Sequence, residues 1–148
     1  MKIDSVDIQI LKHLNDGRKS FQKISKELGV AENTVRARVK KMIDGGLLHI
    51  SGFIDPENMP DCQIYIICVK LKTMNGIQKG EELSKLKGVI FSCVVTGRYD
   101  IIMLVSLNKD YGLAEFFTNE LDPVEGVAYA ETFVAYKCYN VKIPYIME

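Results

Sequence analysis

Residues 20–46, SFQKISKELGVAENTVRARVKKMIDGG, contain two short helical patterns separated by a glycine. In the first pattern Phe21, Ile24 and Leu28 recur at helical spacing. Ser20 stands at the position of an N-cap, and Gly29 supplies a tight turn after the helix.

The second pattern is an amphipathic helix with a basic side. Its apolar stripe consists of Val35, Val39, Met42 and Ile43. Its basic residues fall largely off that stripe: Arg36, Arg38, Lys40 and Lys41. Gly45 and Gly46 are expected to end the helix. A short helix, a glycine turn and a basic amphipathic helix form the helix-turn-helix, which places its second helix in the DNA major groove. The alternative is a helical hairpin with a solvated basic face.

A third helix is expected before this pair. Residues 3–16 carry Ile3, Val6, Ile10, Leu11 and Leu14 on one side. Asp4 and Asp7 have the spacing of a capping box, with Asp in place of the usual Glu or Gln. Three helices around one small core are the minimal folded form of such a unit.

Charge is divided unevenly along the chain. Residues 1–50 carry ten Lys or Arg against six Asp or Glu, whereas residues 51–148 carry nine against thirteen. A basic front half can neutralise DNA phosphates, and an acidic back half should stay away from them. The zero net charge of the 148 residues therefore hides a division that favours DNA binding by the first third.

Composition argues against several other classes of protein. The cysteines at 62, 68, 93 and 138 form no CxxC motif or Cys/His cluster, so we expect reduced, largely buried thiols and no metal site. His13 and His49 are interpreted as core or surface residues. No apolar run approaches the roughly 20 residues of a membrane span, and no signal peptide precedes the first helix. These features predict a cytoplasmic protein without a cofactor or a membrane anchor.

From residue 47 onward the pattern becomes that of alternating strands and helices. Residues 47–59 alternate like an extended segment and break at Asp55-Pro56, which indicates a linking strand. Strands are expected at 62–72, 89–96, 100–107 and 126–139, and helices at 76–87 and 109–121. The inward residues of these helices are expected to be Ile77, Leu83, Leu86, Leu113, Phe116, Phe117 and Leu121, with Asp110 as the second helix's cap. The order βαββαβ predicts a ferredoxin-like antiparallel sheet with two helices on one face.

Both faces of the strand at 62–72 are apolar. Tyr65, Ile67, Val69 and Leu71 point one way, and Ile64, Ile66 and Cys68 the other. Two helices can cover only one face, and a face left in water should carry polar residues. A second subunit packed against the bare face resolves this conflict, so we predict a homodimer, which suits a helix-turn-helix that reads two half-sites.

Taken together, these stretches resemble the Lrp/AsnC (leucine-responsive, or feast/famine) transcriptional regulators over nearly the whole chain. The matching stretches are IDSVDIQIL (3–11), residues 16–48, IDPENM (54–59), VVTGRYDIIMLV (94–105) and GVAYAETFVAYK (126–137). The fourth contains the family's G-x-x-D motif. The resemblance implies an α+β protein: a (winged) helix-turn-helix domain at 1–48, a linker strand at 49–61 and a ferredoxin-like RAM-type domain at 62–148.

The resemblance further implies an amino acid or related small molecule bound between dimers, and dimers that assemble, in many members, into octamers. The implied effector residues are Val94, Gly97, Arg98, Tyr99, Asp100, Asp110, Phe133 and Ala135. Chemistry agrees at Gly97, where exposed backbone lets a carboxylate reach an N–H, and at Asp100, which suits an ammonium group. The alternative is that Gly97 and Asp100 make a plain strand-linking turn and that Asp110 is a plain N-cap.

The same resemblance assigns the DNA contacts. Glu32, Asn33, Thr34, Arg36 and Ala37 would face bases, and Arg18, Arg38, Lys40 and Lys41 would meet phosphates. Arg36 suits a guanine edge and Asn33 an adenine. Ala31 replaces the capping Ser of many relatives, and Glu32 favours the helix dipole while repelling phosphate.

The sequence thus predicts a sequence-specific transcriptional regulator that binds double-stranded DNA and is not an enzyme. Two alternatives remain: an architectural DNA-compacting protein, and an enzyme on the same scaffold resembling siroheme decarboxylases. The enzyme would need His or Arg for a haem-type substrate, and residues 51–148 contain no His and a single Arg, Arg98.

Overall fold

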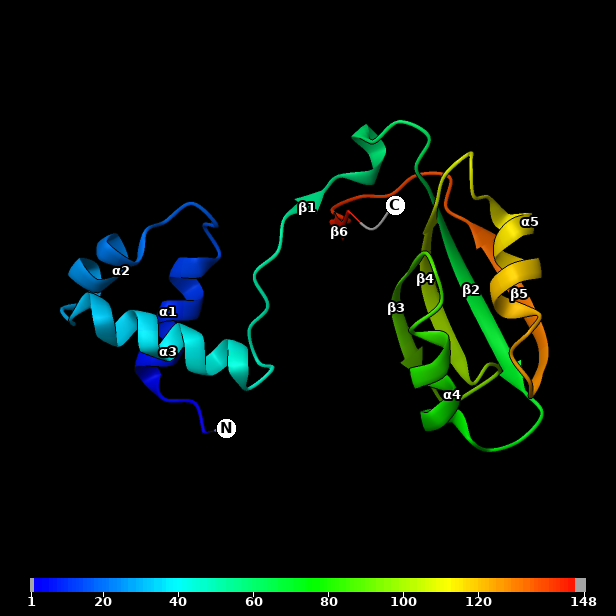
Figure 1. Ribbon diagram of the computed structural model, residues 1–148, viewed down its shortest axis with the longest axis horizontal. Coiled ribbons are helices and arrows are strands. Elements are labelled where there is room, and N and C mark those ends of the chain that lie inside the picture. The colour runs from blue at the N-terminus through cyan, green and yellow to red at the C-terminus, as the bar shows by residue number, and fades with distance from the viewer. Residues whose placement is uncertain (1, 146–148) are drawn as a thin grey trace. The chain divides into compact units, whose positions relative to one another are not determined.

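The computed structural model describes residues 2–145 (Figure 1). Contacts along the chain divide it into two units, Met1–Ser51 and Gly52–Glu148, and each is described by itself.

The N-terminal unit consists of α1 (Ser5–Leu14), α2 (Phe21–Leu28) and α3 (Glu32–Asp44). The predicted caps are confirmed: Asp4 and Asp7 form a reciprocal capping box on α1, and Ser20 accepts the backbone N–H of Lys23 at the start of α2. Gly29 follows α2 with φ 67°, a left-handed conformation that glycine adopts without strain. No strand lies within residues 2–51, so the described part of this unit has no wing.

One apolar core holds the three helices together. It is built from one or more buried side chains of each helix: Ile10, Ile24, Val35, Val39 and Met42. For two residues the prediction of burial is wrong. Ile43 is 42% exposed because it lies one position, about 100° of helix rotation, beyond Met42. Ile3 is 39% exposed because it precedes the first turn of α1.

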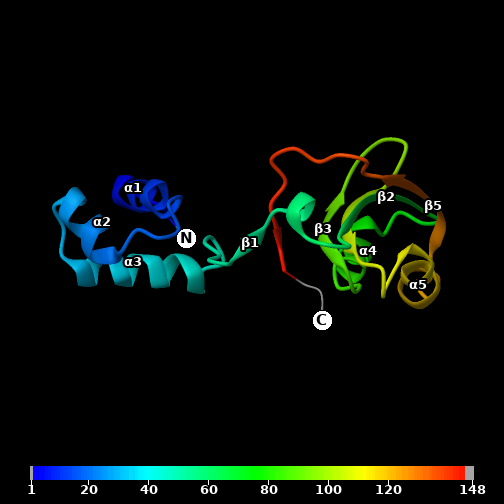
Figure 2. The same cartoon turned by 90° about the horizontal axis from the view of Figure 1, so that it is seen from above.

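The C-terminal unit has the predicted βαββαβ order. Its elements are β2 (Gln63–Leu71), α4 (Gly76–Leu83), β3 (Val89–Val94), β4 (Ile101–Leu107), α5 (Leu113–Phe116) with a π-helical continuation (Phe117–Leu121), and β5 (Val127–Val134). The strands lie in the order β3-β4-β2-β5, and every neighbouring pair is antiparallel. This is the ferredoxin-like topology, with α4 and α5 on the same side of the sheet (Figures 1 and 2).

The helices cover the sheet face that carries Ile67 and Val69. These residues form a buried core with Met103 of β4, Leu83 of α4 and Phe116 of α5. Apolar side chains on this face and on the helices therefore account for the core as predicted.

Two predictions about the helices are wrong. Ile77 is 85% exposed, because α4 turns Gly76 and Gly80 toward the sheet instead. A Cβ at Gly80 would lie 2.6 Å from Cγ2 of Val94, so only glycine permits this approach.

Asp110 does not cap α5. The helix begins at Leu113, and the Glu115 carboxylate accepts the backbone N–H of Gly112 at 3.0 Å. Asn108 supplies the turn before it, because its Oδ1 accepts the N–H groups of Asp110 and Tyr111. Two competing polar residues near one helix start made the sequence ambiguous.

The last predicted strand is shorter than expected, and the chain adds a small ribbon. β5 ends at Val134, and β6 (Ile143–Pro144) pairs with β1 (Phe53–Ile54) of the predicted linker. A 3-10 turn, Pro56–Asn58, follows β1, and Glu57 within it binds Lys137. The segment after β5 therefore holds the linker through both backbone and charge contacts.

Two further features bear on the sequence predictions. All four cysteines are free thiols, with Cys68 buried and the other three half-buried. Among the described residues, no helix is long and apolar enough to cross a bilayer.

Candidate DNA interface and effector pocket

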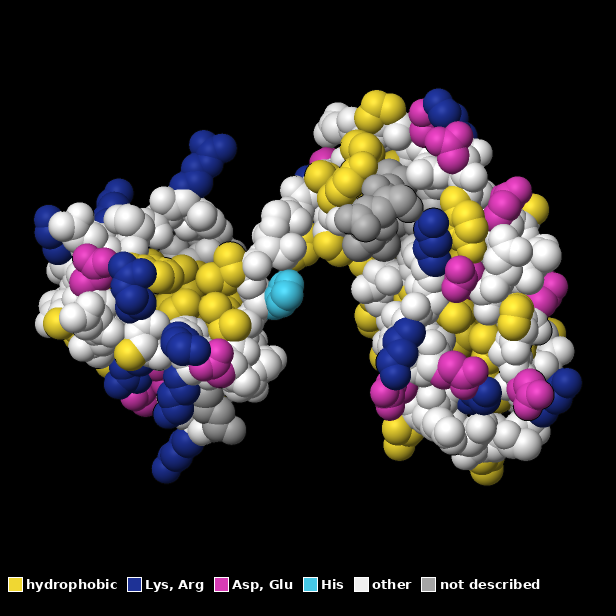
Figure 3. All heavy atoms as spheres, in the orientation of Figure 1, with side chains coloured by type: hydrophobic (Ala, Val, Ile, Leu, Met, Phe, Trp, Pro, Cys, Tyr) yellow, Lys and Arg dark blue, Asp and Glu magenta, His cyan; other side chains and the backbone are white. Residues whose placement is uncertain are grey.

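The outer face of α3 is polar, basic and accessible. Since Val35, Val39 and Met42 turn into the core, the remaining side chains face away from it. The exposed polar side chains and alanine along this face include Asn33, Thr34, Arg36, Ala37, Lys40 and Lys41. Figure 3 shows Lys and Arg side chains projecting from several sides of this unit around an apolar centre. An exposed helix with this composition is suited to a DNA groove.

The start of α3 lacks a side-chain cap, as Ala31 predicts. Ala31 occupies the N-cap position and its methyl group accepts no hydrogen bond. Glu32 follows in the first turn, where its negative charge favours the helix dipole.

Arg36 is oriented by two neighbours. Its Nη2 donates to Oε1 of Glu32 at 2.7 Å, one helical turn earlier. Its guanidinium carbon lies 5.4 Å from the centroid of the Phe21 ring. Glu32 thus contacts Arg36, in addition to standing at the helix start.

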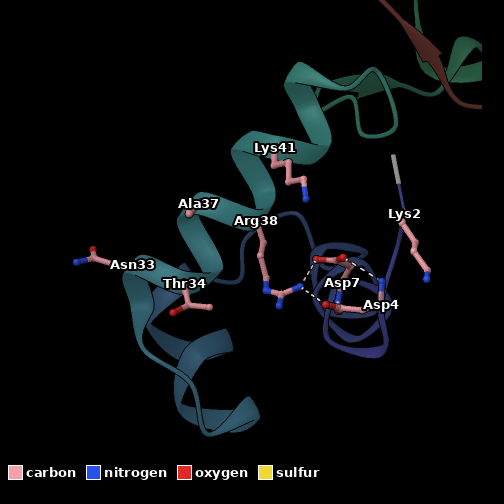
Figure 4. A pocket seen from close by; sticks show the side chains of 8 residues that line it. All are labelled: Lys2, Asp4, Asp7, Asn33, Thr34, Ala37, Arg38 and Lys41. Atoms are coloured by element: carbon pink, nitrogen blue, oxygen red, sulfur yellow. Dashed lines mark hydrogen bonds and ion pairs between the residues drawn. The ribbon is translucent and has the colours of Figure 1, made fainter.

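Arg38 is engaged inside the unit. Its Nη1 donates to Oδ2 of Asp4 and to Oδ1 of Asp7, both at 2.7 Å (Figure 4). The hydrogen bonds that Arg38 donates to Asp7 and then to Asp4 raise the pKa of Arg38 above its ordinary value. The pKa of Asp4 is lowered, first by the backbone N–H of Asp7 and next by Arg38.

The other predicted phosphate contacts differ in their partners. Lys40 Nζ pairs with Oδ2 of Asp44 at 2.8 Å, with both side chains well exposed. Lys41 and Arg18 form no side-chain ion pair with any residue in the range 2–145. An open groove of about 550 Å³ lies between α3 and the start of α1, and its lining includes Asn33, Thr34, Ala37, Arg38 and Lys41.

A second cavity, of about 370 Å³, lies at the β3–β4 turn. Three of the eight predicted effector residues line it: Val94, Gly97 and Asp100. Lys70 of β2 also lines it. Lys70 was not among the predicted site residues, although a lysine within an otherwise apolar strand is a visible signal.

Asp100 is already hydrogen-bonded in this cavity. Its Oδ2 accepts the backbone N–H of Leu71 at 2.8 Å, and its Oδ1 accepts Nζ of Lys70 at 2.9 Å. The Leu71 N–H and then Lys70 hold the pKa of this carboxyl below its ordinary value. Gly97 in the same turn has φ 139°, a region that side chains rarely adopt.

The other five predicted effector residues lie outside this cavity. Arg98 and Tyr99 contact residues of β5: Arg98 lies 3.8 Å from Glu131, and the Tyr99 ring lies 6.3 Å from that of Tyr129.

The remaining three lie away from the turn. Phe133 pairs with Ile66, and the N–H of Ala135 donates to the carbonyl of Ile64, toward the other end of β2 from Leu71. Asp110 lies in the loop between β4 and α5. One chain therefore does not bring the eight residues together.

Comparisons with known proteins agree with this architecture. Residues 3–43 match the model of the AsnC-type helix-turn-helix domain. An HTH-type transcriptional regulator of Pyrococcus furiosus is 34% identical over 134 residues, covering 89% of this chain and 90% of that protein. The HTH-type transcriptional regulator Ptr1 of Methanocaldococcus jannaschii is 32% identical over 129 residues, covering 84% of this chain and 86% of Ptr1.

Solved structures share the fold. AsnC of E. coli superposes with a TM-score of 0.73 at 23% identity, covering 93% of this chain and 95% of AsnC. The transcriptional regulator NMB0573 of Neisseria meningitidis, solved as a complex with L-Met, superposes with a TM-score of 0.72 at 19% identity. That superposition covers 99% of this chain and 97% of NMB0573.

The fold and these relatives define a helix-turn-helix transcriptional regulator that binds DNA. The chain belongs to the Lrp/AsnC family. Neither the architectural alternative nor the siroheme decarboxylase alternative finds support among the relatives, which are named as transcriptional regulators.

Proposed function

We propose that this regulator binds its operators as a homodimer, in the cytoplasm, and that a small molecule of the amino-acid class alters its assembly or its affinity for DNA. The observation that carries the DNA part is the accessible face of α3. Asn33, Thr34 and Arg36 are exposed there beside Lys41, whose charge no described carboxylate neutralises.

Within this proposal, contacts to bases come from the N-terminal two turns of α3. Arg36 reads a guanine edge and Asn33 an adenine, with Thr34 and Ala37 packed against neighbouring bases. Glu32 holds Arg36 and disfavours a misplaced phosphate. Lys40, Lys41 and Arg18 contact phosphates, which position the helix without carrying sequence information.

Arg36→Ala tests this assignment. Genomic fragments bound by the wild-type protein are first selected, and affinities for the best site and for random DNA are then measured at fixed salt. We expect Arg36→Ala to cost about 1–3 kcal/mol at the selected site and much less on random DNA. Lys41→Ala is the matched control, because losing a phosphate contact should weaken binding to both DNAs equally. Equal losses for Arg36→Ala on the two DNAs would contradict base reading.

The homodimer is proposed from the sheet face that the helices leave bare. Its apolar side chains follow the register of all four strands: Ile64, Ile66, Cys68, Phe91, Cys93, Ile102, Leu104, Tyr129 and Phe133. Ile66 is 39% exposed, Phe91 50% and Phe133 48% in the single chain. Three such side chains in one patch call for a covering partner, and a twofold-related copy offers the same surface.

The effector site is proposed at the cavity beside Gly97 and Asp100. A neighbour of the same fold was solved with L-Met, and the cavity's volume suits a molecule of that size. The ammonium group would lie beside Asp100 and the carboxylate near the backbone at Gly97. Since Asp110, Phe133 and Ala135 lie elsewhere on the chain, further copies in an octamer are proposed to supply them.

Amino acids tested singly by light scattering and gel shift check the effector proposal. A true effector must change assembly or DNA affinity, because it shifts an equilibrium only by its differential affinity for the two states. Asp100→Asn should abolish that response, while Asp110→Asn reports whether the more distant carboxylate takes part. If no amino acid changes either readout, the effector proposal fails and the DNA proposal stands.

A further inference from the structure

We infer that Arg38 is a positioning residue of the DNA-binding unit: it pairs with both Asp4 and Asp7 beside the groove instead of contacting a DNA phosphate. The inference rests on the proposed use of α3 as the DNA interface. It changes the role of one of the four predicted phosphate contacts and adds two carboxylates that no sequence argument placed there.

Every carboxylate oxygen of the cluster accepts a hydrogen bond. One nitrogen of Arg38 binds both carboxylates at 2.7 Å, across sequence separations of 34 and 31 residues. The second oxygen of Asp4 accepts the N–H groups of Val6 and Asp7, each at 2.9 Å. The second oxygen of Asp7 accepts the N–H of Asp4 at 3.1 Å. The capping box of α1 and the side chain from α3 therefore form one network.

Releasing Arg38 from this network has a cost. Asp7 is 8% exposed, so water cannot replace the guanidinium freely. If Arg38 turned to a phosphate, the Asp7 carboxylate would be left without its only cationic partner among the described residues. Leaving a charge desolvated and unpaired is strongly unfavourable, so the pairing should persist in the DNA complex.

The location of the cluster gives it a role in DNA binding. Asp4 and Asp7 line the same groove as Asn33, Thr34, Ala37 and Lys41, as Figure 4 shows. Without Arg38, two carboxylates would stand beside the helix that enters the polyanion. With Arg38 in place, its positive charge offsets one of the two negative charges, and its side chain ties the start of α1 to α3. Lys2 also lines this groove.

Three variants test the inference: Arg38→Gln, the triple variant Asp4→Asn/Asp7→Asn/Arg38→Gln, and Lys41→Gln as the control for a phosphate contact. Asparagine keeps a side-chain oxygen at the N-cap, so the triple variant should retain the helix start. Affinity for one selected duplex is measured over a range of salt, and thermal unfolding reports folding.

We expect Arg38→Gln to weaken binding about tenfold or more, because two unneutralised carboxylates then face the DNA. The triple variant should recover to within about threefold of wild type and keep the wild-type salt slope, whereas Lys41→Gln should lower that slope by about 0.9. If Arg38→Gln does not fold, the triple variant still decides the question. A triple variant that binds weakly with a slope lower by about 0.9 would overturn the inference.

The controls separate this inference from the proposed DNA interface. If Lys41→Gln and Arg36→Ala weaken binding and the triple variant does not recover, the role of Arg38 is wrong and the interface stands. If Lys41→Gln and Arg36→Ala both bind as wild type does, the interface is wrong and the inference falls with it.

Discussion

At the residue scale, Asp100 contributes to the stability of the sheet and also lines the proposed effector site. Its carboxylate joins the end of β2, through Leu71, to the β3–β4 turn and holds Lys70 against the cavity. The backbone closes the same turn, because the N–H of Val95 donates to the carbonyl of Asp100 at 2.8 Å. A ligand at this turn would therefore act on a residue that also fixes the sheet.

The first prediction is that the ionisation of Asp100 makes the stability of the protein depend on pH. Its folded pKa is lowered by the Leu71 N–H and Lys70, so the stabilisation is present above the unfolded pKa of about 4. It is lost as the pH falls from about 4 through the lower folded pKa. In urea unfolding at pH 6 and pH 3, Asp100→Asn should therefore lose less stability on acidification than wild type. Equal losses in the two proteins would show that the carboxylate contributes nothing in this window.

The second prediction concerns Gly97. At φ 139°, an alanine would be strained, yet its Cβ would meet no atom within 4 Å. Gly97→Ala should therefore cost about 1–3 kcal/mol of unfolding free energy through backbone strain alone. Gly17→Ala is the matched control, since a Cβ there also meets open space and φ is not in the strained range. If Gly97→Ala and Gly17→Ala have equal free energies of unfolding, the predicted backbone strain at position 97 is contradicted.

At the scale of elements, α2 and α3 differ at their starts. Ser20 caps α2 with its side chain, whereas Ala31 leaves the first N–H groups of α3 without a side-chain acceptor. An uncapped recognition helix sacrifices stability at the end that is proposed to enter DNA, where phosphates can accept those N–H groups.

The third prediction follows from that difference. Ala31→Ser should raise the unfolding free energy by about 1 kcal/mol, because the hydroxyl can accept the N–H of Asn33 or Thr34. Ser20→Ala should lower it by a similar amount, which makes the pair a matched test in urea unfolding. If Ala31→Ser does not raise the free energy of unfolding, the first N–H groups of α3 already have other hydrogen-bond acceptors.

The elements also show what sequence can and cannot predict. Periodicity identified the five α-helices and the βαββαβ order along the chain, because burial of apolar stripes dominates the energy. It failed at Ile77, where the close approach of Gly80 to Val94 outweighs the burial of one isoleucine. It also missed the β1–β6 ribbon, since two-residue strands carry no periodic signal.

The candidate sites were predictable to a smaller extent. The residue types on α3 were visible in its helical pattern, and the β3–β4 turn was visible in the motif at 97–100. The pairing of Arg38 with Asp4 was not visible in the sequence. Asp4 lies 34 residues away, and only the folded core brings the two side chains together. Pairings of this kind depend on tertiary packing, which a single sequence does not display.

At the scale of the whole molecule, the proposed dimerisation through the bare sheet face links the C-terminal unit to DNA binding. A dimer held through this face presents two copies of α3, so its affinity for paired half-sites exceeds that of one unit through effective concentration. The strength of DNA binding should therefore depend on residues of the C-terminal unit that never touch DNA.

The fourth prediction tests that dependence. Ile66→Glu places a charge at the centre of the bare face, where a partner sheet would desolvate it. We expect light scattering to give the 16.7 kDa monomer and affinity for a two-half-site duplex to fall about a hundredfold. Affinity for a single half-site should be nearly unchanged, since α3 is intact. Ile8→Glu is the control, because Ile8 is a comparably exposed isoleucine, at 49%, on α1. A dimeric Ile66→Glu protein, or an equal loss of affinity with one and two half-sites, would contradict the assembly proposed here.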